Sequence, residues 1–326
     1  MQILVALFLI PSLIDQVGME RFGFLTLAWV VIGYFSIFDF GLGRPLPRLV
    51  SEGLTGIDKN SLPGLLWTSQ MILFGVGSLG LVILLLGSEW FVTSALAVEG
   101  ELEAEVLRSF LLISYVIPFI TTSAGFRGVL EAYHRFDLVN MVRIPLGIIM
   151  FAGPLLASFY DTTLDAMVFT LVIARLVSWL AYMVMCLALD PVLRLRPRFV
   201  LYEVRSLMSF GGWMTVSNIV GPIMLYLDRF LIGSMVSVLA VAYYATPYEV
   251  ITKLLIIPAA FASAVFPGLS PSLFRGEKEE TVRLYRFGIT SIFVLVWLPV
   301  AVVSTFSSEL LFFWLGEDFA ENSSSI

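Results

Sequence analysis

Residues 22–53 read FGFLTLAWVVIGYFSIFDFGLGRPLPRLVSEG and join an apolar span to the turn that ends it. The apolar part carries no charged residue before Asp39, and its length is close to the ~20 residues that a helix needs to cross a bilayer. The turn that follows is rich in Gly and Pro and carries Arg44 and Arg48. We interpret this stretch as a membrane helix that leaves the bilayer on the side where positive charge collects.

The composition of the whole chain favours a membrane protein over a soluble domain. Hydrophobic residues make up 59% of the 326 residues, charged residues only 13%, and the mean hydropathy is +0.94. Soluble domains are usually about one quarter charged and about half apolar. The single cysteine, Cys186, excludes an intrachain disulfide, and the single histidine, His134, leaves no histidine cluster. We therefore expect no metal site and no cofactor.

Further apolar stretches predict an all-α fold, a polytopic transmembrane bundle of about nine helices. The expected helices cover residues 3–14, 22–42, 62–87, 109–130, 141–159, 166–189, 207–227, 238–266 and 284–306. The first is too short to cross a bilayer, so we interpret it as the end of an incomplete helix. We expect a first six-helix bundle over residues 1–190, a basic cytoplasmic linker over 191–206, and the first three helices of a second bundle over 207–326.

The cations fall almost entirely on one side of these helices, which the positive-inside rule makes the cytoplasmic side. The opposite side holds only Arg21, Arg108 and Arg229, and Arg175 and Lys253 lie inside predicted spans. The cations of the cytoplasmic side are Arg44, Arg48, Lys59, Arg127, Arg135, Arg143, Arg194, Arg196, Arg198, Arg205, Arg275, Lys278, Arg283 and Arg286. The outer side is acidic, and we interpret one of its loops as a solvated face that holds Glu99, Glu101, Glu103 and Glu105.

Three stretches carry a resemblance to a known family. They are ERFGFLTLAW with DFGLGRPLPRLVSEG (from Glu20), LDRFLIGSMVSVLAVAYYATPYEVITKL (227–254) and FFWLGEDF (312–319). They resemble the polysaccharide repeat-unit (O-antigen type) flippases of the multidrug/oligosaccharidyl-lipid/polysaccharide exporter superfamily. The resemblance implies two six-helix bundles around a central cavity. Because this chain holds about nine helices, we expect a truncated member of the family.

The resemblance implies export of a polyprenyl-diphosphate-linked oligosaccharide across the plasma (inner) membrane, by alternating access, for cell-surface polysaccharide synthesis. The implied partners are the lipid bilayer and the lipid-linked oligosaccharide, with no nucleic acid. Contact with glycan polymerase or ligase machinery is left open. The alternatives are a drug/cation antiporter of the same superfamily and a membrane glycosyltransferase or polymerase. The sequence has no evident nucleophile–base pair and no phosphate-binding glycine loop, so we expect no catalytic residue and no enzyme.

Arg175 is the cation best placed for such a substrate. It lies well inside the predicted helix 166–189, where a charge costs about 2.5–3.5 kcal/mol on insertion scales and usually faces a protein interior. Ser178 and Tyr182 follow at i+3 and i+7 and share its helix face. The three side chains either bind substrate on a cavity wall or tie the helix to its neighbours, and both interpretations stay open.

A second group of charges lies on the predicted helix 238–266. Glu249 precedes Lys253 by four residues, the favoured order for a helical ion pair. The pair either neutralises itself or belongs to the cavity, where Lys253 would bind substrate and Glu249 would couple an ion. Asp39 is either a local partner of Arg44 or a second ion-coupling carboxylate. The predicted substrate-binding residues are therefore Arg175, Ser178, Tyr182 and Lys253, and the predicted ion-coupling residues are Glu249 and Asp39.

Overall fold

The computed structural model describes residues 2–37, 45–55, 62–96, 98, 100–194, 199–200, 202, 204, 220–221, 224, 226–255, 258, 261 and 278–324. Within these residues the regular elements are helices, without a strand, which confirms the all-α class. They are α1 (Gln2–Ile37), α2 (Pro45–Thr55), α3 (Leu62–Trp90), η2 (Phe91–Ala95), α4 (Glu101–Ala132), α5 (Phe136–Ser158), α6 (Leu164–Leu189), η3 (Pro191–Arg194), α8 (Val238–Lys253), α10 (Lys278–Thr305), α11 (Ser307–Leu315) and α12 (Glu317–Ser324).

Six helical stretches of the described chain are long and apolar enough to cross a membrane. They are Val5–Phe35, Leu62–Ser94, Leu102–Ala132, Phe136–Ser158, Leu164–Leu189 and Val282–Thr305. The chain divides into two compact units, Met1–Ala242 and Tyr243–Ile326, which we call the first and the second unit. The predicted division at the linker 191–206 stays a prediction, because part of that linker lies outside the described residues.

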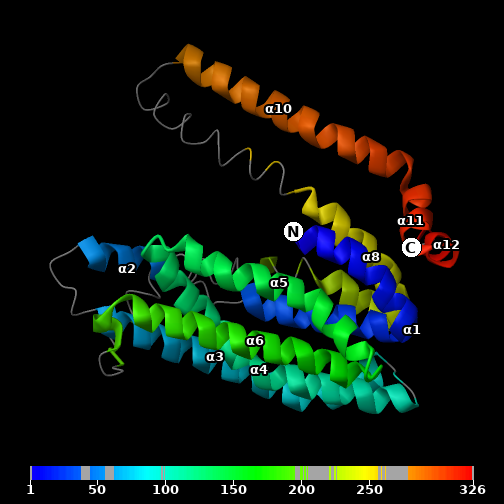
Figure 1. The fold of residues 1–326 in the computed structure, drawn as a ribbon, viewed down its shortest axis with the longest axis horizontal. Coiled ribbons are helices and arrows are strands. Elements are labelled where there is room, and N and C mark those ends of the chain that lie inside the picture. The colour runs from blue at the N-terminus through cyan, green and yellow to red at the C-terminus, as the bar shows by residue number, and fades with distance from the viewer. Residues whose placement is uncertain are drawn as a thin grey trace. The chain divides into compact units, whose positions relative to one another are not determined.

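α1 joins the first two predicted helices across a break at Gly18. The backbone of Gly18 has φ 79° and ψ 163°, far from helical values, and such a conformation costs little only in glycine. Figure 1 shows the two blue segments of α1 that the break separates. α1 ends at Ile37, so Asp39 and Arg44 lie outside the described residues.

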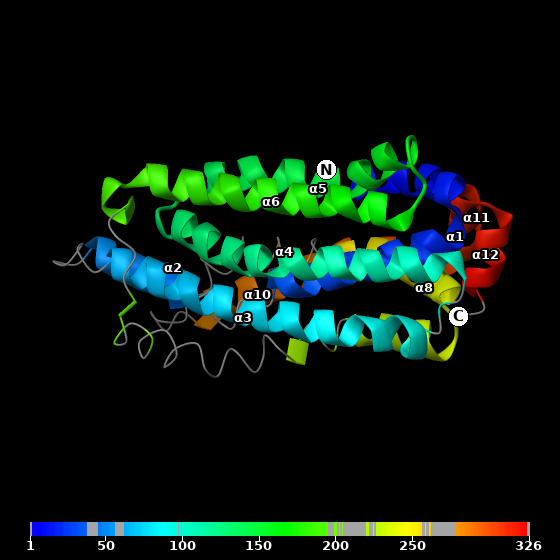
Figure 2. The same ribbon diagram turned by 90° about the horizontal axis from the view of Figure 1, so that it is seen from below.

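The first unit packs α1 and α3–α6 side by side. Different side-chain hydrogen bonds join the helices at its two ends. At one end, which we call the inner end, α4 stops beside α6, and Tyr133 Oη donates to Asp190 at 3.0 Å. Burial, together with this hydrogen bond, raises the pKa of Tyr133, so it stays a neutral donor. At the opposite, outer end, Ser158 Oγ donates to Gln16 at 2.7 Å, next to the break in α1. Figure 2 shows α2 at one end and the bend of α1 at the other.

An apolar cluster holds the inner half of this unit together. α2 joins it because Leu46 and Val50, one helical turn apart, are buried, while Arg48 and Glu52 are exposed and pair at 2.8 Å. The Ser51 Oγ bond to the Ala132 carbonyl, at 3.4 Å, ties α2 to the end of α4. The buried members of the cluster are Leu46, Val50, Leu62, Leu65, Leu66, Leu73, Phe126, Val129, Leu130, Ala132, Val139, Val142, Tyr182, Cys186 and Leu193.

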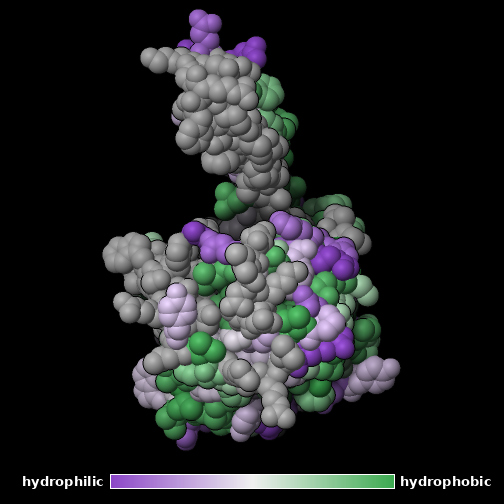
Figure 3. Space-filling model, turned by 90° about the vertical axis from the view of Figure 1, so that its left-hand side faces the viewer, coloured by the Kyte–Doolittle hydropathy of each residue, from purple (hydrophilic) through white to green (hydrophobic). Residues whose placement is uncertain are grey.

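The ends of the helices bear out the predicted grouping of cations within the first unit. Arg48 on α2, Arg127 near the end of α4, and Arg194 in η3 all belong to the inner end, whereas Arg21 and Arg108 belong to the outer end. Figure 3 views the first unit from the end at which α2 lies, and hydrophilic side chains lie among apolar ones there. That the inner end faces the cytoplasm stays a prediction.

The prediction of a solvated acidic loop over Glu99–Glu105 is wrong in two respects: part of the segment is helical, and one of its acids is buried. α4 begins at Glu101, eight residues before the start that the apolar pattern indicates, because acidic residues are favoured in the first turn of a helix. Glu105 is consequently one turn inside α4 and only 6% exposed, so it is not part of a solvated face.

The helix predicted over residues 238–266 is interrupted. α8 ends at Lys253, and the N–H groups of Leu254 and Leu255 turn back to carbonyls three residues earlier, at 3.0 and 3.2 Å. Pro258 explains the interruption, because proline lacks the N–H that a continuing helix would donate to the carbonyl of residue 254.

The second unit is built from the end of α8 and from α10, α11 and α12. Phe319 of α12 is buried and meets the ring of Tyr243 edge to face, with 5.0 Å between centroids. Ser323 Oγ also donates to the Tyr243 carbonyl at 3.0 Å. The segment after α10 forms two short helices, α11 and α12.

Candidate functional site

The predicted residues Arg175, Ser178 and Tyr182 lie on the buried face of α6. This face forms because large apolar side chains occupy the opposite side of the helix, where lipid can solvate them. The exposed side chains of that opposite side are Phe169, Ile173, Val177, Leu180 and Val184. Ser178 and Tyr182 are buried, and Arg175 is half-buried. The stripe predicted from the spacing is thus confirmed as one inward face.

The hydrogen bonds of these three side chains differ. Ser178 Oγ donates to the Ala174 carbonyl of its own helix at 2.7 Å, so its proton is already used. Tyr182 Oη lies 3.4 Å from the Val139 carbonyl of α5. Arg175 Nε is buried without a hydrogen-bond partner among the described residues. An unsatisfied buried donor is costly, which favours the binding interpretation of Arg175 over the structural one for this nitrogen.

Arg175 and Tyr182 belong to a larger group of charges that the sequence did not reveal. Arg127 and Glu131 of α4, Arg143 of α5, and Arg175 lie within electrostatic range of the Tyr182 hydroxyl, and Arg127 also lies within that range of Arg175. We call these five residues the inner cluster. Three of its members are cations and one is an acid, so the cluster has an excess of positive charge.

Arg127 is the second arginine of this cluster whose Nε is buried without a hydrogen bond. Its Nε lies 3.4 Å from Glu131 Oε1, one turn further along α4, and both side chains are about one third exposed. From the sequence, Arg127 and Arg143 count only among the cations that indicate the cytoplasmic side. The sequence does not distinguish a cation that faces lipid headgroups from one that faces a neighbouring helix. The one usable signal was the i, i+4 spacing of Arg127 and Glu131.

The other predicted site residues are placed only in part. Glu249 lies on α8, as expected, and is half-buried. The side chain of Lys253 and all of Asp39 lie outside the described residues. Substrate binding by Lys253 and ion coupling by Glu249 and Asp39 therefore stay predictions.

The outer end of the first unit holds two arginines that each pair with a carboxylate. Arg21 donates from Nε and Nη2 to Glu105 at 3.0 and 2.8 Å, and the Leu164 N–H at the start of α6 donates to the same carboxylate at 2.9 Å. Arg108 donates to Asp165 from Nε at 2.8 Å and from Nη2 at 3.4 Å. We call these two contacts the outer ion pairs. They join α1, α4 and α6.

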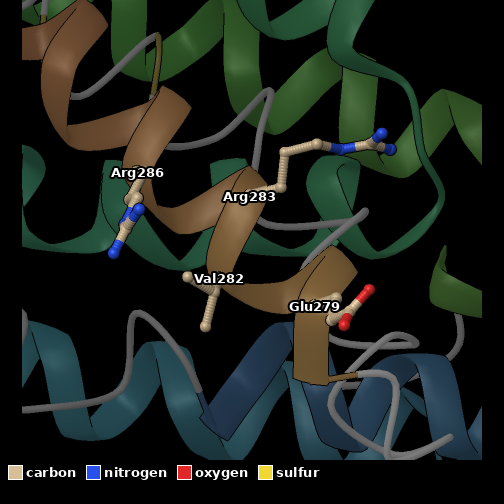
Figure 4. A pocket seen from close by; sticks show the side chains of 4 residues that line it. All are labelled: Glu279, Val282, Arg283 and Arg286. Carbon is tan, nitrogen blue, oxygen red and sulfur yellow. The ribbon is translucent and has the colours of Figure 1, made fainter.

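The second unit carries a surface hollow of about 460 Å³ on α10. Four exposed side chains line it at successive turns of one helix face, namely Glu279, Val282, Arg283 and Arg286 (Figure 4). Their spacing of i, i+3, i+4 and i+7 explains the shared face. Within the described residues, no group of three or more His, Cys, Asp or Glu could hold a metal ion.

A protein-family model and two similar proteins each match most of this chain. The family model described as polysaccharide biosynthesis protein matches residues 2–272. A protein of Shigella flexneri, provisionally named an O-antigen transporter, is 33% identical over 97% of this chain and 75% of its own length. A protein of Haloferax volcanii, provisionally named a low-salt glycan biosynthesis flippase, is 24% identical over 93% of this chain and 60% of its own length.

One solved structure shares the fold. It is an inward-facing multidrug resistance MATE family transporter of the MOP superfamily, with a TM-score of 0.80 and 12% sequence identity. The match covers 99% of this chain and 75% of that protein. At this identity the likeness concerns the fold alone. The family match over residues 2–272 and the 33% identity with the Shigella flexneri protein confirm the family resemblance seen in the sequence. The chain is a multi-pass membrane protein that belongs to the polysaccharide biosynthesis protein family.

Proposed function

We propose that the chain moves a polyprenyl-diphosphate-linked oligosaccharide across the plasma (inner) membrane for the synthesis of a cell-surface polysaccharide. The movement proceeds by alternating access, in which a polar site opens to one side of the membrane and then to the other. The lipid tail stays in the bilayer while the diphosphate and the sugars pass through the protein. The chain acts as a transporter and not as an enzyme.

The observation that carries the proposal is the buried, unpaired Nε of Arg175 on the inward face of α6. A guanidinium in a membrane-spanning helix is expensive and normally has a partner or a role. Phosphate oxygens are the acceptors that arginine binds best, often through two parallel hydrogen bonds. An anionic, oxygen-rich substrate head would therefore satisfy the donor that the protein leaves open.

The family and the named relatives support the same class of substrate. The names of two relatives, an O-antigen transporter and a low-salt glycan biosynthesis flippase, both refer to glycans. The inner cluster adds an excess of positive charge in the same region of the first unit. Contact with a glycan polymerase or ligase would follow from this role, since those enzymes use the exported unit.

A drug/cation antiporter is the nearest alternative, because the solved structure with the same fold is a multidrug transporter. Export of organic cations would call for acidic groups in the site, whereas the described inner cluster has three arginines and one acid. The cluster therefore favours an anionic substrate.

The test is glycan display in cells that depend on this chain as their only flippase. We expect Arg175→Ala to lower display by about tenfold or more, because a hydrogen bond to a charged group contributes about 1.5–3 kcal/mol. Lys253→Ala should also lower display if Lys253 binds substrate. Arg48→Ala is the matched control, since Arg48 lies on the exposed face of α2 and pairs with Glu52.

Undiminished display by both Arg175→Ala and Lys253→Ala would overturn the assignment of these residues. The antiporter alternative gives a different pattern: neutralising Glu249 by Glu249→Gln would abolish drug efflux and leave glycan display intact. Protein amounts in the membrane are measured alongside, so that a loss of folding is not mistaken for a loss of transport.

A further inference from the structure

The inner cluster contains one acid, Glu131, among its arginines. The contact of Glu131 with Arg127 is longer than a normal hydrogen bond between charged groups. Glu131 Oε1 lies 3.4 Å from Arg127 Nε, and that nitrogen has no hydrogen bond to any of the residues that the structure describes. A charge-assisted hydrogen bond would normally be about 2.7–2.9 Å long. Glu131 is thus close enough to attract Arg127 but does not satisfy it.

Paired charges elsewhere in the chain show what a satisfied contact looks like. Arg48 and Glu52 on α2 have the same i, i+4 order, yet their atoms meet at 2.8 Å on an exposed helix face. Arg21 and Glu105 meet at 2.8 Å, with the Glu105 carboxylate nearly buried. The looser contact of Arg127 with Glu131 therefore reflects its surroundings and not its spacing in sequence.

Those surroundings bring further positive charge to the same place. Arg127, Arg143 and Arg175 come from three different helices, and all lie within electrostatic range of the Tyr182 hydroxyl, as Glu131 does. Tyr182 Oη is 3.4 Å from the carbonyl of Val139, which lies one turn before Arg143 on α5, and Tyr182 lies two turns after Arg175 on α6. The net charge of the group is +2 at neutral pH. A diphosphate that links two organic groups has one ionised oxygen on each phosphorus, so its charge matches this excess in magnitude.

We infer that Glu131 is an internal counter-ion of a diphosphate site. When the site is empty, Glu131 attracts Arg127; when substrate enters, the diphosphate displaces Glu131 and binds between Arg127, Arg143 and Arg175. Glu131 thereby weakens binding and favours release, as a transporter needs in order to turn over. The substrate named here rests on the proposed function, whereas the competition between Glu131 and an anion does not.

The test measures binding to the purified chain in detergent, with farnesyl diphosphate as a soluble probe and farnesol as the probe that lacks the anion. We expect Glu131→Gln to bind farnesyl diphosphate roughly fivefold more tightly, the size of a partly exposed ion pair converted to affinity. Arg127→Gln should bind it roughly tenfold more weakly. Glu52→Gln is the matched control and should change nothing, because it removes the acid of an exposed Arg–Glu pair with the same spacing.

A double substitution shows whether Glu131 acts through Arg127. In the Arg127→Gln background, Glu131→Gln should bring little or no gain, since the arginine for which it competes is absent. An equal gain in both backgrounds, or equal affinity for farnesyl diphosphate and farnesol, would overturn the inference. Arg127→Lys, which keeps the charge, should retain binding and shows that the site remains folded.

The same variants separate this inference from the proposed function. If the unaltered chain supports glycan display but Glu131→Gln binds the probe like the unaltered chain, the counter-ion is wrong and the proposed function stands. If the binding pattern holds but the unaltered chain supports no glycan display, the anion site stands and the glycan is the wrong cargo.

Discussion

At the outer end of the first unit Arg21 and Arg108 each meet a carboxylate at 2.8 Å, whereas in the inner cluster Arg127 and Arg175 each keep a buried Nε that has no hydrogen bond within the described residues. Arginines thus stand in two different settings within one bundle. Each outer pair joins two helices through the Nε and Nη2 groups of its arginine. An unsatisfied buried donor costs stability, and our proposal that the inner arginines bind an anion gives that cost a function.

The outer end should lose the most stability when its more buried pair is broken. Glu105→Gln leaves the Arg21 guanidinium, which is 31% exposed, without its charge partner. Breaking a fully buried pair costs about 3–5 kcal/mol, and for this partly exposed pair we expect a loss of about 1.5–3 kcal/mol. We expect a clear drop in Tm, measured by thermal unfolding of the purified protein in detergent. Replacing both residues, Arg21→Met with Glu105→Leu, should recover much of the loss. A Tm that does not change in Glu105→Gln would mean that the outer pairs do not brace the bundle.

The inner cluster should respond in the opposite direction. Arg175→Leu removes a buried unsatisfied donor and its charge, so we expect a gain of about 1–3 kcal/mol in stability together with the loss of glycan display. The two readouts are Tm in detergent and display in cells. A Tm lower than that of the unaltered chain would show that Arg175 has a structural partner and would remove the contrast between the two ends.

The smallest effect is expected at the exposed outer pair. Arg108 is 54% exposed, so its pairing with Asp165 is screened by solvent and should contribute little to stability. Arg108→Ala should lower Tm only slightly, and added salt should reduce the difference further. A drop as large as that of Glu105→Gln would show that burial does not decide which outer pair matters.

The inward face of α6 could be predicted from sequence because it depends only on the spacing of residues within one helix. Arg175, Ser178 and Tyr182 recur at helical spacing within an otherwise apolar span, and a charge in such a span is rarely left facing lipid. The family resemblance was also visible in short motifs. Both inferences need only neighbours along the chain.

The partners across the bundle could not be predicted in this way. Arg21 and Glu105 are 84 residues apart, and Arg108 and Asp165 are 57 apart, so only the folded chain brings them together. Glu105 looked like part of a solvated loop because α4 starts with acids that a hydropathy pattern assigns to water. Arg127 is typical of a residue that marks membrane sidedness, because the sequence indicates how far along the helix it lies but not in which direction its side chain points.

The single cysteine has a practical consequence for labelling. Cys186 is fully buried in the apolar cluster of the inner end, where a thiol reacts poorly with water-soluble reagents. The unmodified protein is therefore already a suitable background for introducing one new cysteine at a time. A cysteine placed at Asn140, an exposed position one turn before Arg143 on α5, would report by its rate of maleimide labelling whether a ligand covers the inner cluster and would leave its arginines in place.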